Sequence, residues 1–307
     1  MTERLYYHDS TLHEFEAAVL DVLSESNSGS RPAVVLDRTA FYPSSGGQVF
    51  DTGWIVVADQ RKVRVTEVAE REDGTILHYL ESAPAMEKGS RVRGLIDVER
   101  RRDHMQQHSG QHVLSAAFAR LFNMGTVSFH MGADYCSIDL DTKSLSSEQV
   151  QAAEALANDV VMENRAVAIR FVTQEEARNL GLRKLPSMEK EQLRLIDIRD
   201  FDLTACGGTH VSGTGQIGCI LLRKTEKVKP GWRVEFVCGK RAVATARRDY
   251  ATLAEAASLF CSHLWDVPQQ VKKAQEEARA SRKSREQLLE ELADKAMPCR
   301  APARACR

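Results

Sequence analysis

The sequence predicts an α+β fold with three parts: a small antiparallel β-barrel, a central α+β domain and a helical arm. Short β-rich runs separated by turn residues occupy residues 1–98, whereas helical and strand-like segments alternate over residues 99–239. From Lys240 onward the chain is Ala-rich, charged and without strand patterns. We therefore place the arm at residues 240–296 and expect the Pro-, Arg- and Cys-containing tail, residues 297–307, to be disordered.

β-branched and alternating residues in the first part predict strands that form an antiparallel barrel or sandwich. The runs are AVVLD at 33–37, GWIVVAD at 53–59, KVRVTEV at 62–68, TILHYL at 75–80 and RVRGLIDV at 91–98. We expect one helix to interrupt them near the N-terminus, because apolar residues recur there at helical spacing. These residues are Phe15, Val19, Val22 and Leu23.

The central part contains three predicted helices. Residues 99–122 contain no proline and carry an apolar stripe that ends at Asn123. Two further helix starts are predicted by pairs with capping-box spacing, Ser146 with Gln149 and Thr173 with Glu176. Strands are expected at 167–172 and 193–198, and as a hairpin at 215–239.

The helical arm is interrupted at Pro268, and its second segment has few apolar residues. Among them are Leu288, Leu289 and Leu292. We therefore expect an exposed helix that needs a partner, and a second copy of the chain would supply one.

The composition excludes several classes of protein. The chain has 307 residues, 43% of them hydrophobic and 28% charged, so it is not a disordered chain. Its formal net charge of -1 excludes a polybasic binder, and any contact with nucleic acid must come from local basic patches. Seven cysteines at irregular spacing do not suggest a disulfide framework. No membrane helix or secretory leader is evident, so we expect a soluble, cytoplasmic protein.

Two histidine-containing pairs share a spacing that suits a metal ion. His108 and His112 stand four apart in HSGQH on the predicted helix, so both imidazoles project from one face. Cys206 and His210 repeat this spacing in the Gly-rich segment CGGTH. Alone, the first pair could be two half-exposed helix histidines, but the four residues together form a ligand set that favours Zn²⁺. A metalloprotease is excluded because its HExxH motif needs Glu where this chain has Ser109.

The segment DRTAFYPSSGGQVFDTG at 37–53 has two interpretations. In the first it is a hairpin in which Pro43 and the following small residues turn the chain. In the second, Thr39 and Gln48 are polar groups that flank a ligand site, and the backbone at Gly46 and Gly47 approaches that ligand. The residues alone favour the hairpin. His104, one turn before His108, is expected on the surface.

The motifs DxTxFYPxxGGQ, HxxxH and CGGTH, in this order, resemble the editing domain of alanyl-tRNA synthetases and the free-standing AlaX proteins. The resemblance covers roughly residues 3–240, and MQQHSGQHVLSAAF is more similar to the AlaX branch. It implies that residues 99–239 form a zinc-binding editing domain of the second-additional-domain type. The arm is similar to the linker of the long AlaX type, whose C-terminal domain we do not find here.

The family implies hydrolysis of the ester that joins Ser or Gly to the tRNA for alanine. A pocket that accepts alanine cannot strongly exclude these two, because the differences are worth only about 1 to 3 kcal/mol. By the resemblance, His108, His112, Cys206 and His210 are zinc ligands. Thr39 would meet the serine hydroxyl and Gln48 would line the pocket, while Gly46, Gly47, Gly207 and Gly208 would lie against the substrate. We expect editing in trans, without aminoacylation.

Several alternatives stay open at this point. Zinc either activates water and polarises the ester, or holds the pocket while amides at residues 206–208 stabilise the oxyanion and Gln48 orients water. A non-catalytic tRNA-binding module with a structural zinc is the runner-up function, and editing of Ser-tRNA for threonine is disfavoured. The arm either extends the tRNA contact or dimerises. Candidate phosphate contacts are Arg100, Arg101, Arg102, Arg223, Lys224, Lys227, Lys229, Arg233, Lys240 and Arg241.

Overall fold

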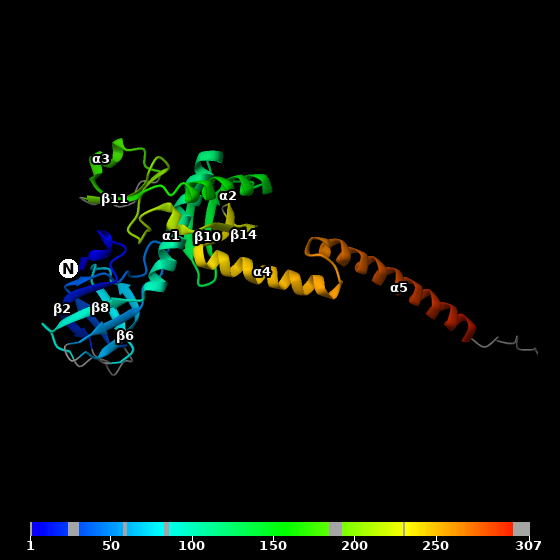
Figure 1. The fold of residues 1–307 in the computed structure, drawn as a ribbon, viewed down its shortest axis with the longest axis horizontal. Helices are drawn as coiled ribbons and strands as arrows, with labels where there is room; N and C mark the ends of the chain where they lie inside the picture. Colours follow the sequence, from blue (N-terminus) through cyan, green and yellow to red (C-terminus); the bar gives the residue numbers. More distant parts are fainter. Residues whose placement is uncertain are drawn as a thin grey trace, which may run out of the picture. The chain divides into compact units, whose positions relative to one another are not determined.

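The computed structural model describes residues 2–23, 31–57, 60–82, 86–183, 192–229 and 231–296. The chain divides into two compact units, Met1–Val243 and Ala244–Arg307. The described residues of the first unit form a β-barrel and three smaller sheets, and those of the second are helical (Figure 1). This arrangement confirms the predicted α+β class. The boundary predicted after residue 98 lies inside the first unit and stays a prediction.

Six strands close into an antiparallel barrel in the order β2-β3-β7-β6-β5-β8. Closure leaves these strands without a free edge and encloses a core of buried apolar side chains. The strands are β2 (Glu14–Leu23), β3 (Ala33–Leu36), β5 (Gly53–Val56), β6 (Lys62–Glu70), β7 (Ile76–Leu80) and β8 (Arg91–Ile96). A short parallel pair stands outside the barrel and joins β1 (Glu3–Arg4) to β4 (Arg38–Thr39), with the 3-10 turn η1 (Leu5–Tyr7) between them in the chain.

The helix predicted near the N-terminus is wrong, because this segment is strand β2. Phe15, Ala17 and Val19 are buried at alternate positions, as a strand requires. The register then shifts between Val19 and Asp21, where β2 pairs with β3, and this irregularity inserts one residue. The insertion moves the next inward position to Val22 and so imitates helical spacing in the sequence.

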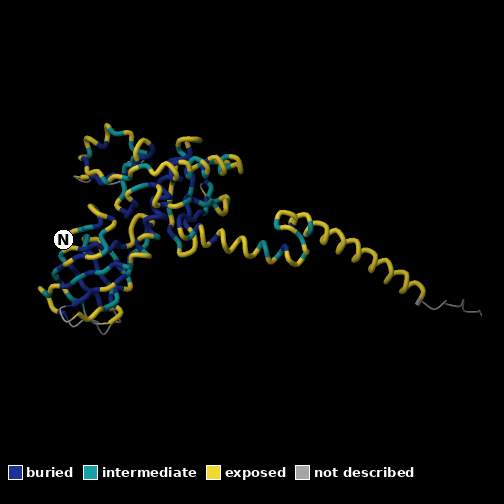
Figure 2. The backbone as a smooth tube through the Cα atoms, in the orientation of Figure 1, coloured by how far each residue is buried: buried dark blue, intermediate teal, exposed yellow. Residues whose placement is uncertain are grey.

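Helix α1 (Val98–Phe122) follows the barrel directly. The Asp97 side chain caps its start by accepting a hydrogen bond from the Arg100 N–H, and Asn123 ends it in the left-handed region at φ 54°. From His104 to Phe118 every residue of α1 is buried, which Figure 2 shows as a dark blue stretch. The helix is thus enclosed on all sides, so its polar residues must find partners inside the protein.

Two sheets complete the first unit. One has the order β14-β15-β10-β9, and its apolar face joins α1 and α2 in a common core. The other has the order β11-β12-β13. The elements are β9 (Gly125–Met131), β10 (Cys136–Asp141), α2 (Ser147–Met162), β11 (Val167–Thr173), α3 (Gln174–Asn179), β12 (Gln192–Ile198), β13 (Asp202–Ala205), η2 (Thr214–Ile217), β14 (Ile220–Lys227) and β15 (Trp232–Cys238).

Both predicted capping boxes are present at the starts of α2 and α3. The strands predicted at 167–172, 193–198 and in the 215–239 hairpin are also confirmed as β11, β12 and the β14–β15 pair. Strands β9, β10 and β13 were not expected from the sequence.

Helix α4 (Gly239–Leu259) begins in the first unit and continues into the second, which also holds η3 (Leu264–Asp266) and α5 (Val267–Ala296). Pro268 lies in the first turn of α5, where it costs no internal hydrogen bond. Leu288, Leu289 and Leu292 are exposed, as expected. Within the described ranges, no helix combines the length and the hydropathy needed to cross a membrane. The predicted disordered tail lies outside the described residues.

Candidate metal centre

The structure brings His108, His112, Cys206 and His210 to one point. α1 carries the two histidines one turn apart, and the loop after β13 supplies the thiol and the third imidazole. The Cys206 Sγ lies 3.5 Å from His108 Nε2 and 3.3 Å from His210 Nε2. One ligand atom from each of the four residues lies within 4.8 Å of the others. This cluster could therefore hold a metal ion.

The donor set and its spacing fit zinc. A tetrahedral zinc with Zn–S of about 2.3 Å and Zn–N of about 2.0 Å places its sulfur and nitrogen ligands about 3.5 Å apart. The two sulfur–nitrogen distances of the cluster, 3.5 and 3.3 Å, agree with this geometry. Cations that prefer oxygen, such as Mg²⁺, are disfavoured because the four ligand atoms include no oxygen.

Each of the three histidines has its Nδ1 atom turned to a neighbouring polar group, which leaves Nε2 for a metal. The Nδ1 of His108 lies 2.7 Å from Gln48 Oε1, and that of His210 lies 3.1 Å from Ser109 Oγ. The Nδ1 of His112 lies 3.5 Å from a carboxylate oxygen of Asp202. Such outer contacts fix the orientation and the tautomer of metal-binding histidines.

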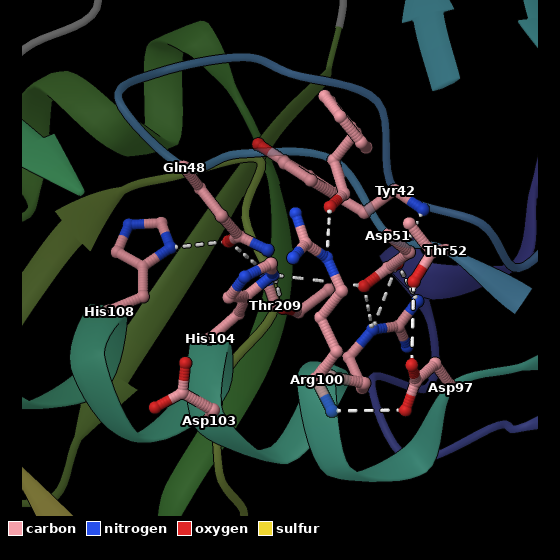
Figure 3. A network of polar contacts seen from close by, with 12 residues as sticks. Tyr42, Gln48, Asp51, Thr52, Asp97, Arg100, Asp103, His104, His108 and Thr209 are labelled. Atoms are coloured by element: carbon pink, nitrogen blue, oxygen red, sulfur yellow. Dashed lines mark hydrogen bonds and ion pairs between the residues drawn. The ribbon is translucent and has the colours of Figure 1, made fainter. Parts of the chain in front are cut away.

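Gln48 is committed to this supporting role. Its Oε1 accepts hydrogen bonds from the His108 ring and from the Thr209 N–H at 3.1 Å, and its Nε2 donates to Thr209 Oγ1 at 2.9 Å. Figure 3 shows the Gln48 side chain reaching from its loop to His108 on α1 and to Thr209. The motif at 37–53 marked Gln48 as a residue that lines the pocket or orients water, and its hydrogen bond to the His108 ring was not expected.

The charges of the cluster favour a thiolate beside imidazole. Burial by itself raises the pKa of Cys206, but the neighbouring His108 and His210 hold that pKa well below its ordinary value. Burial lowers the pKa of His210 well below its ordinary value. For His112, burial acts in the same direction, but the Asp202 carboxylate and Cys206 together outweigh it and raise the pKa. A deprotonated thiol and available imidazole nitrogens are the forms that bind zinc.

Two glycines allow the loops to approach this centre. A side chain at Gly208 would place its Cβ 2.1 Å from His108 Cε1, so only glycine fits under that ring. Gly47 has φ +85°, and a Cβ there would lie 2.4 Å from the Phe129 carbonyl oxygen. The Phe129 ring in turn stacks on His108, with centroids 5.4 Å apart. Gly46 and Gly207 meet no such close neighbour.

Thr39 lies in β4, beside the barrel, and is fully buried. Its hydroxyl lies 2.8 Å from His78 Nε2 and accepts the Phe41 N–H at 3.1 Å. Since His78 Nδ1 faces the Val34 carbonyl oxygen at 3.1 Å, Nδ1 carries the ring proton and the Thr39 hydroxyl donates to Nε2. One lone pair of the Thr39 oxygen therefore remains for a further donor.

The expected surface position of His104 is wrong: the residue is 2% exposed. Arg101, expected to meet phosphate, is also buried, and it forms an ion pair with Asp51. Both residues lie on the first turns of α1, which other segments of the chain cover. Arg101 contacts the Ser10 carbonyl oxygen and Asp51, and His104 Nδ1 lies 3.9 Å from Asp51. A pattern of charged residues at a helix start cannot reveal this cover.

Other predicted phosphate contacts are paired with carboxylates. Ion pairs join Arg233 to Asp139, Lys224 to Glu226, Lys240 to Glu99 and Arg241 to Asp103. Arg102, Lys227 and Lys229 are exposed, and their side chains make no hydrogen bond or ion pair within the part of the chain that the structure describes. The positive charge available for contact with phosphate is therefore smaller than the number of basic residues in these clusters suggests.

Sequence reasoning missed Ser109 and Asp202 as supports of the centre. Ser109 was noted only as the residue that replaces a protease glutamate. Asp202 carries no motif signal, because its contact with His112 depends on how β13 pairs with β12 and packs on α1.

Two family models match the chain. The model described as tRNA synthetases class II (A) matches residues 2–100, which include the barrel. The model described as Threonyl and Alanyl tRNA synthetase second additional domain matches residues 193–234, which include Cys206 and His210.

The similar proteins are of two kinds. The alanine–tRNA ligase of Pyrococcus furiosus is 36% identical over 299 residues, which cover 95% of this chain and 32% of the ligase. The alanyl-tRNA editing protein AlaX-L of Pyrococcus horikoshii is 37% identical over 256 residues, which cover 81% of this chain and 62% of that protein. The chain thus spans about a third of the length of the ligase. The two matched regions and these identities show that the chain is similar both to alanyl-tRNA synthetases and to AlaX-type editing proteins.

Proposed function

We propose that this chain hydrolyses the ester bond of tRNA for alanine that carries serine or glycine, with a zinc ion held by His108, His112, Cys206 and His210. Three observations support the proposal: the named activity of the AlaX-L relative, the match to the second additional domain, and the cluster itself. The cluster carries most weight, because each imidazole has its outer nitrogen already turned to a neighbouring polar group.

In this proposal the metal ion and the protein side chains have different roles. A bound zinc ion supplies a Lewis acid beside the ester and lowers the pKa of water. Gln48, Ser109 and Asp202 hold the histidine rings, and the thiolate of Cys206 fixes the loop. Thr39 stays our candidate for the selectivity toward serine, since its oxygen retains one acceptor position.

Metal analysis and a deacylation assay test this function together. Purified protein should contain one zinc per chain and should release serine from Ser-tRNA for alanine. Cys206→Ala and His108→Ala should lose both the metal and the activity. If release continues unchanged in these variants, the metal has no part in the reaction. Seryl-tRNA for threonine is the substrate control, and we expect slower release from it.

A non-catalytic tRNA-binding module with a structural zinc is the second candidate. It is favoured by the number of protein ligands, because a zinc with four is normally a closed structural site. Zinc in the protein together with tRNA binding, but without release of serine or glycine, would establish this alternative. Action in trans, the absence of aminoacylation and a dimer through the helical arm stay predictions, which added substrate, a charging assay and sedimentation can check.

A further inference from the structure

Strands β12 and β13 form one wall of the metal centre. Ile196 pairs with Thr204 and Ile198 with Asp202 in antiparallel register, and the Cys206 N–H continues the ladder by donating to the Arg194 carbonyl at 3.1 Å. Side chains alternate between the two faces of a strand, and paired residues share a face. Asp202, Thr204, Cys206 and Arg194 therefore share one face. Asp202 contacts His112 and Cys206 belongs to the cluster, so this face is turned toward the metal centre.

Two hydrogen-bonding groups on this face have no partner among the described residues. Arg194 is 7% exposed; its Nε donates to the Tyr7 carbonyl oxygen at 2.8 Å and its Nη1 to the Cys206 carbonyl oxygen at 2.6 Å. Within the part of the chain that the structure describes, its buried Nη2 atom makes no hydrogen bond, and neither does the hydroxyl of Thr204, which is 6% exposed. Unpaired polar groups of this kind are rare in native proteins and need an explanation.

The backbone donors of the loop are largely used. The Cys206 N–H is paired with Arg194, the Gly208 N–H points to Cys206 Sγ at 3.4 Å, and the Thr209 N–H is taken by Gln48. From Cys206 to His210, only the Gly207 amide makes no hydrogen bond within the described residues. Amides at 206–208 can therefore supply at most one donor to an oxyanion, and the two unpaired groups of the wall are further donors.

We propose that Arg194 Nη2 and the Thr204 hydroxyl form a subsite for the carbonyl oxygen of the aminoacyl ester. The inference rests on the proposed function. A guanidinium donates only, so its partner must be an acceptor, and its fixed positive charge repels the α-ammonium group of the substrate. The acceptor that adjoins the reacting carbon is the ester carbonyl. Negative charge develops on that oxygen during attack by water, and fixed donors in a dry site stabilise it.

The Arg194 guanidinium is held in place by two hydrogen bonds to the backbone. Nε and Nη1 are anchored on two backbone carbonyls, so the planar guanidinium holds Nη2 in one direction. The Tyr7 ring lies against the guanidinium, 5.5 Å from its carbon to the ring centroid. Nη2 and the Thr204 oxygen are closed to solvent, so the ester reaches them only after the groups that cover them move.

Binding of two stable analogues tests the subsite apart from turnover. The probes are 3′-(L-seryl)amino-3′-deoxyadenosine, which has the acyl carbonyl, and 3′-amino-3′-deoxyadenosine, which lacks it. Calorimetry on the zinc-loaded protein should show that Arg194→Gln and Thr204→Val each weaken the first probe at least tenfold and leave the second within twofold. Equal weakening of both probes, or of neither, overturns the subsite. If wild type binds the first probe but releases no serine, the proposed function fails and the subsite stands.

Kinetics provide the second readout. We expect Arg194→Gln to lower kcat for Ser-tRNA deacylation by about 10²- to 10³-fold, with KM within threefold, as for other donors to an oxyanion. Arg194→Lys should recover at least tenfold of this loss. Zinc content must stay at one per chain, which separates the effect from damage to Cys206. Arg93→Gln and Thr66→Val, on the barrel surface, are matched controls that leave kcat unchanged. Unchanged kcat in Thr204→Val means that a trapped water satisfies the hydroxyl, and it refutes the subsite.

Discussion

The buried ion pair between Arg101 and Asp51 should be among the most sensitive points of the first unit. Both side chains are 0% exposed. Arg101 also donates to the carbonyl oxygens of Ser10 and Ala40, and Asp51 also accepts the Tyr42 N–H at 2.7 Å. Figure 3 shows Asp51 between the start of α1 and the loop of Tyr42. The pair therefore joins α1 to three separate backbone segments.

Replacing Asp51 by Asn keeps the size of the side chain but leaves the Arg101 charge buried without a counter-ion. Loss of one partner of a fully buried pair costs about 3–5 kcal/mol of the free energy of unfolding. An exposed pair is worth at most about 1 kcal/mol. The pair of Arg93 and Glu14 is of that second kind, with side chains 43% and 57% exposed. Glu14→Gln is thus the matched control.

Urea unfolding followed by tryptophan fluorescence and by far-UV circular dichroism measures both changes. The double variant Asp51→Asn/Arg101→Met should recover part of the lost free energy, because no buried charge then remains. A cost below about 1 kcal/mol for Asp51→Asn, equal to that of the control, would refute the claim that this pair is a buried link between α1 and the barrel.

Three further changes should have defined effects. Gln48→Met should weaken zinc binding about 10- to 100-fold in a chelator competition, because His108 loses its outer partner; an unchanged affinity would contradict the assigned role. Gly208→Ala should also reduce zinc content, since its Cβ meets the His108 ring, whereas Gly46→Ala should not reduce it. Burial lowers the pKa of His78 to about 4, against about 6.5 in the unfolded chain. The unfolded state thus binds the extra proton between these values, and the free energy of unfolding should fall by up to about 1.4 kcal/mol per pH unit as the pH drops from 6.5 to 4. The pKa of buried His104 is lowered to about 4 as well, so His78→Gln should remove one proton's share of the slope, and an unchanged slope would contradict the role of His78.

Local patterns predicted most elements of this fold. The capping boxes at Ser146 and Thr173 need only residues three apart, and the structure has both. β2 was mistaken for a helix because an irregularity in its pairing with β3 is a tertiary event that changes the apolar spacing. Of the missed strands, β9 and β13 pair with their neighbours in the chain, β10 and β12, whereas β10 also pairs with the distant β15.

In the candidate site, too, some residues could be predicted from local spacing and others could not. The spacing of His108 and His112, and of Cys206 and His210, marked four ligand candidates, because a metal requires particular atoms and short motifs carry them. Of their supports, Ser109 and Asp202 had no such signal, whereas the GGQ motif marked Gln48 as a residue that lines the pocket or orients water, and its contact with His108 was not expected.

The sequence by itself determined the α+β class, the capped helices and the four candidate ligands, since each depends on residue type and near spacing. Only the tertiary structure decided which charges are available. It buried Arg101 and His104 and fastened Gln48 to His108 across 60 residues of chain. It also left Arg194 Nη2 and the Thr204 hydroxyl unpaired on the wall of the centre. Burial and pairing depend on segments distant in the chain, and no local pattern of residues records which segments those are.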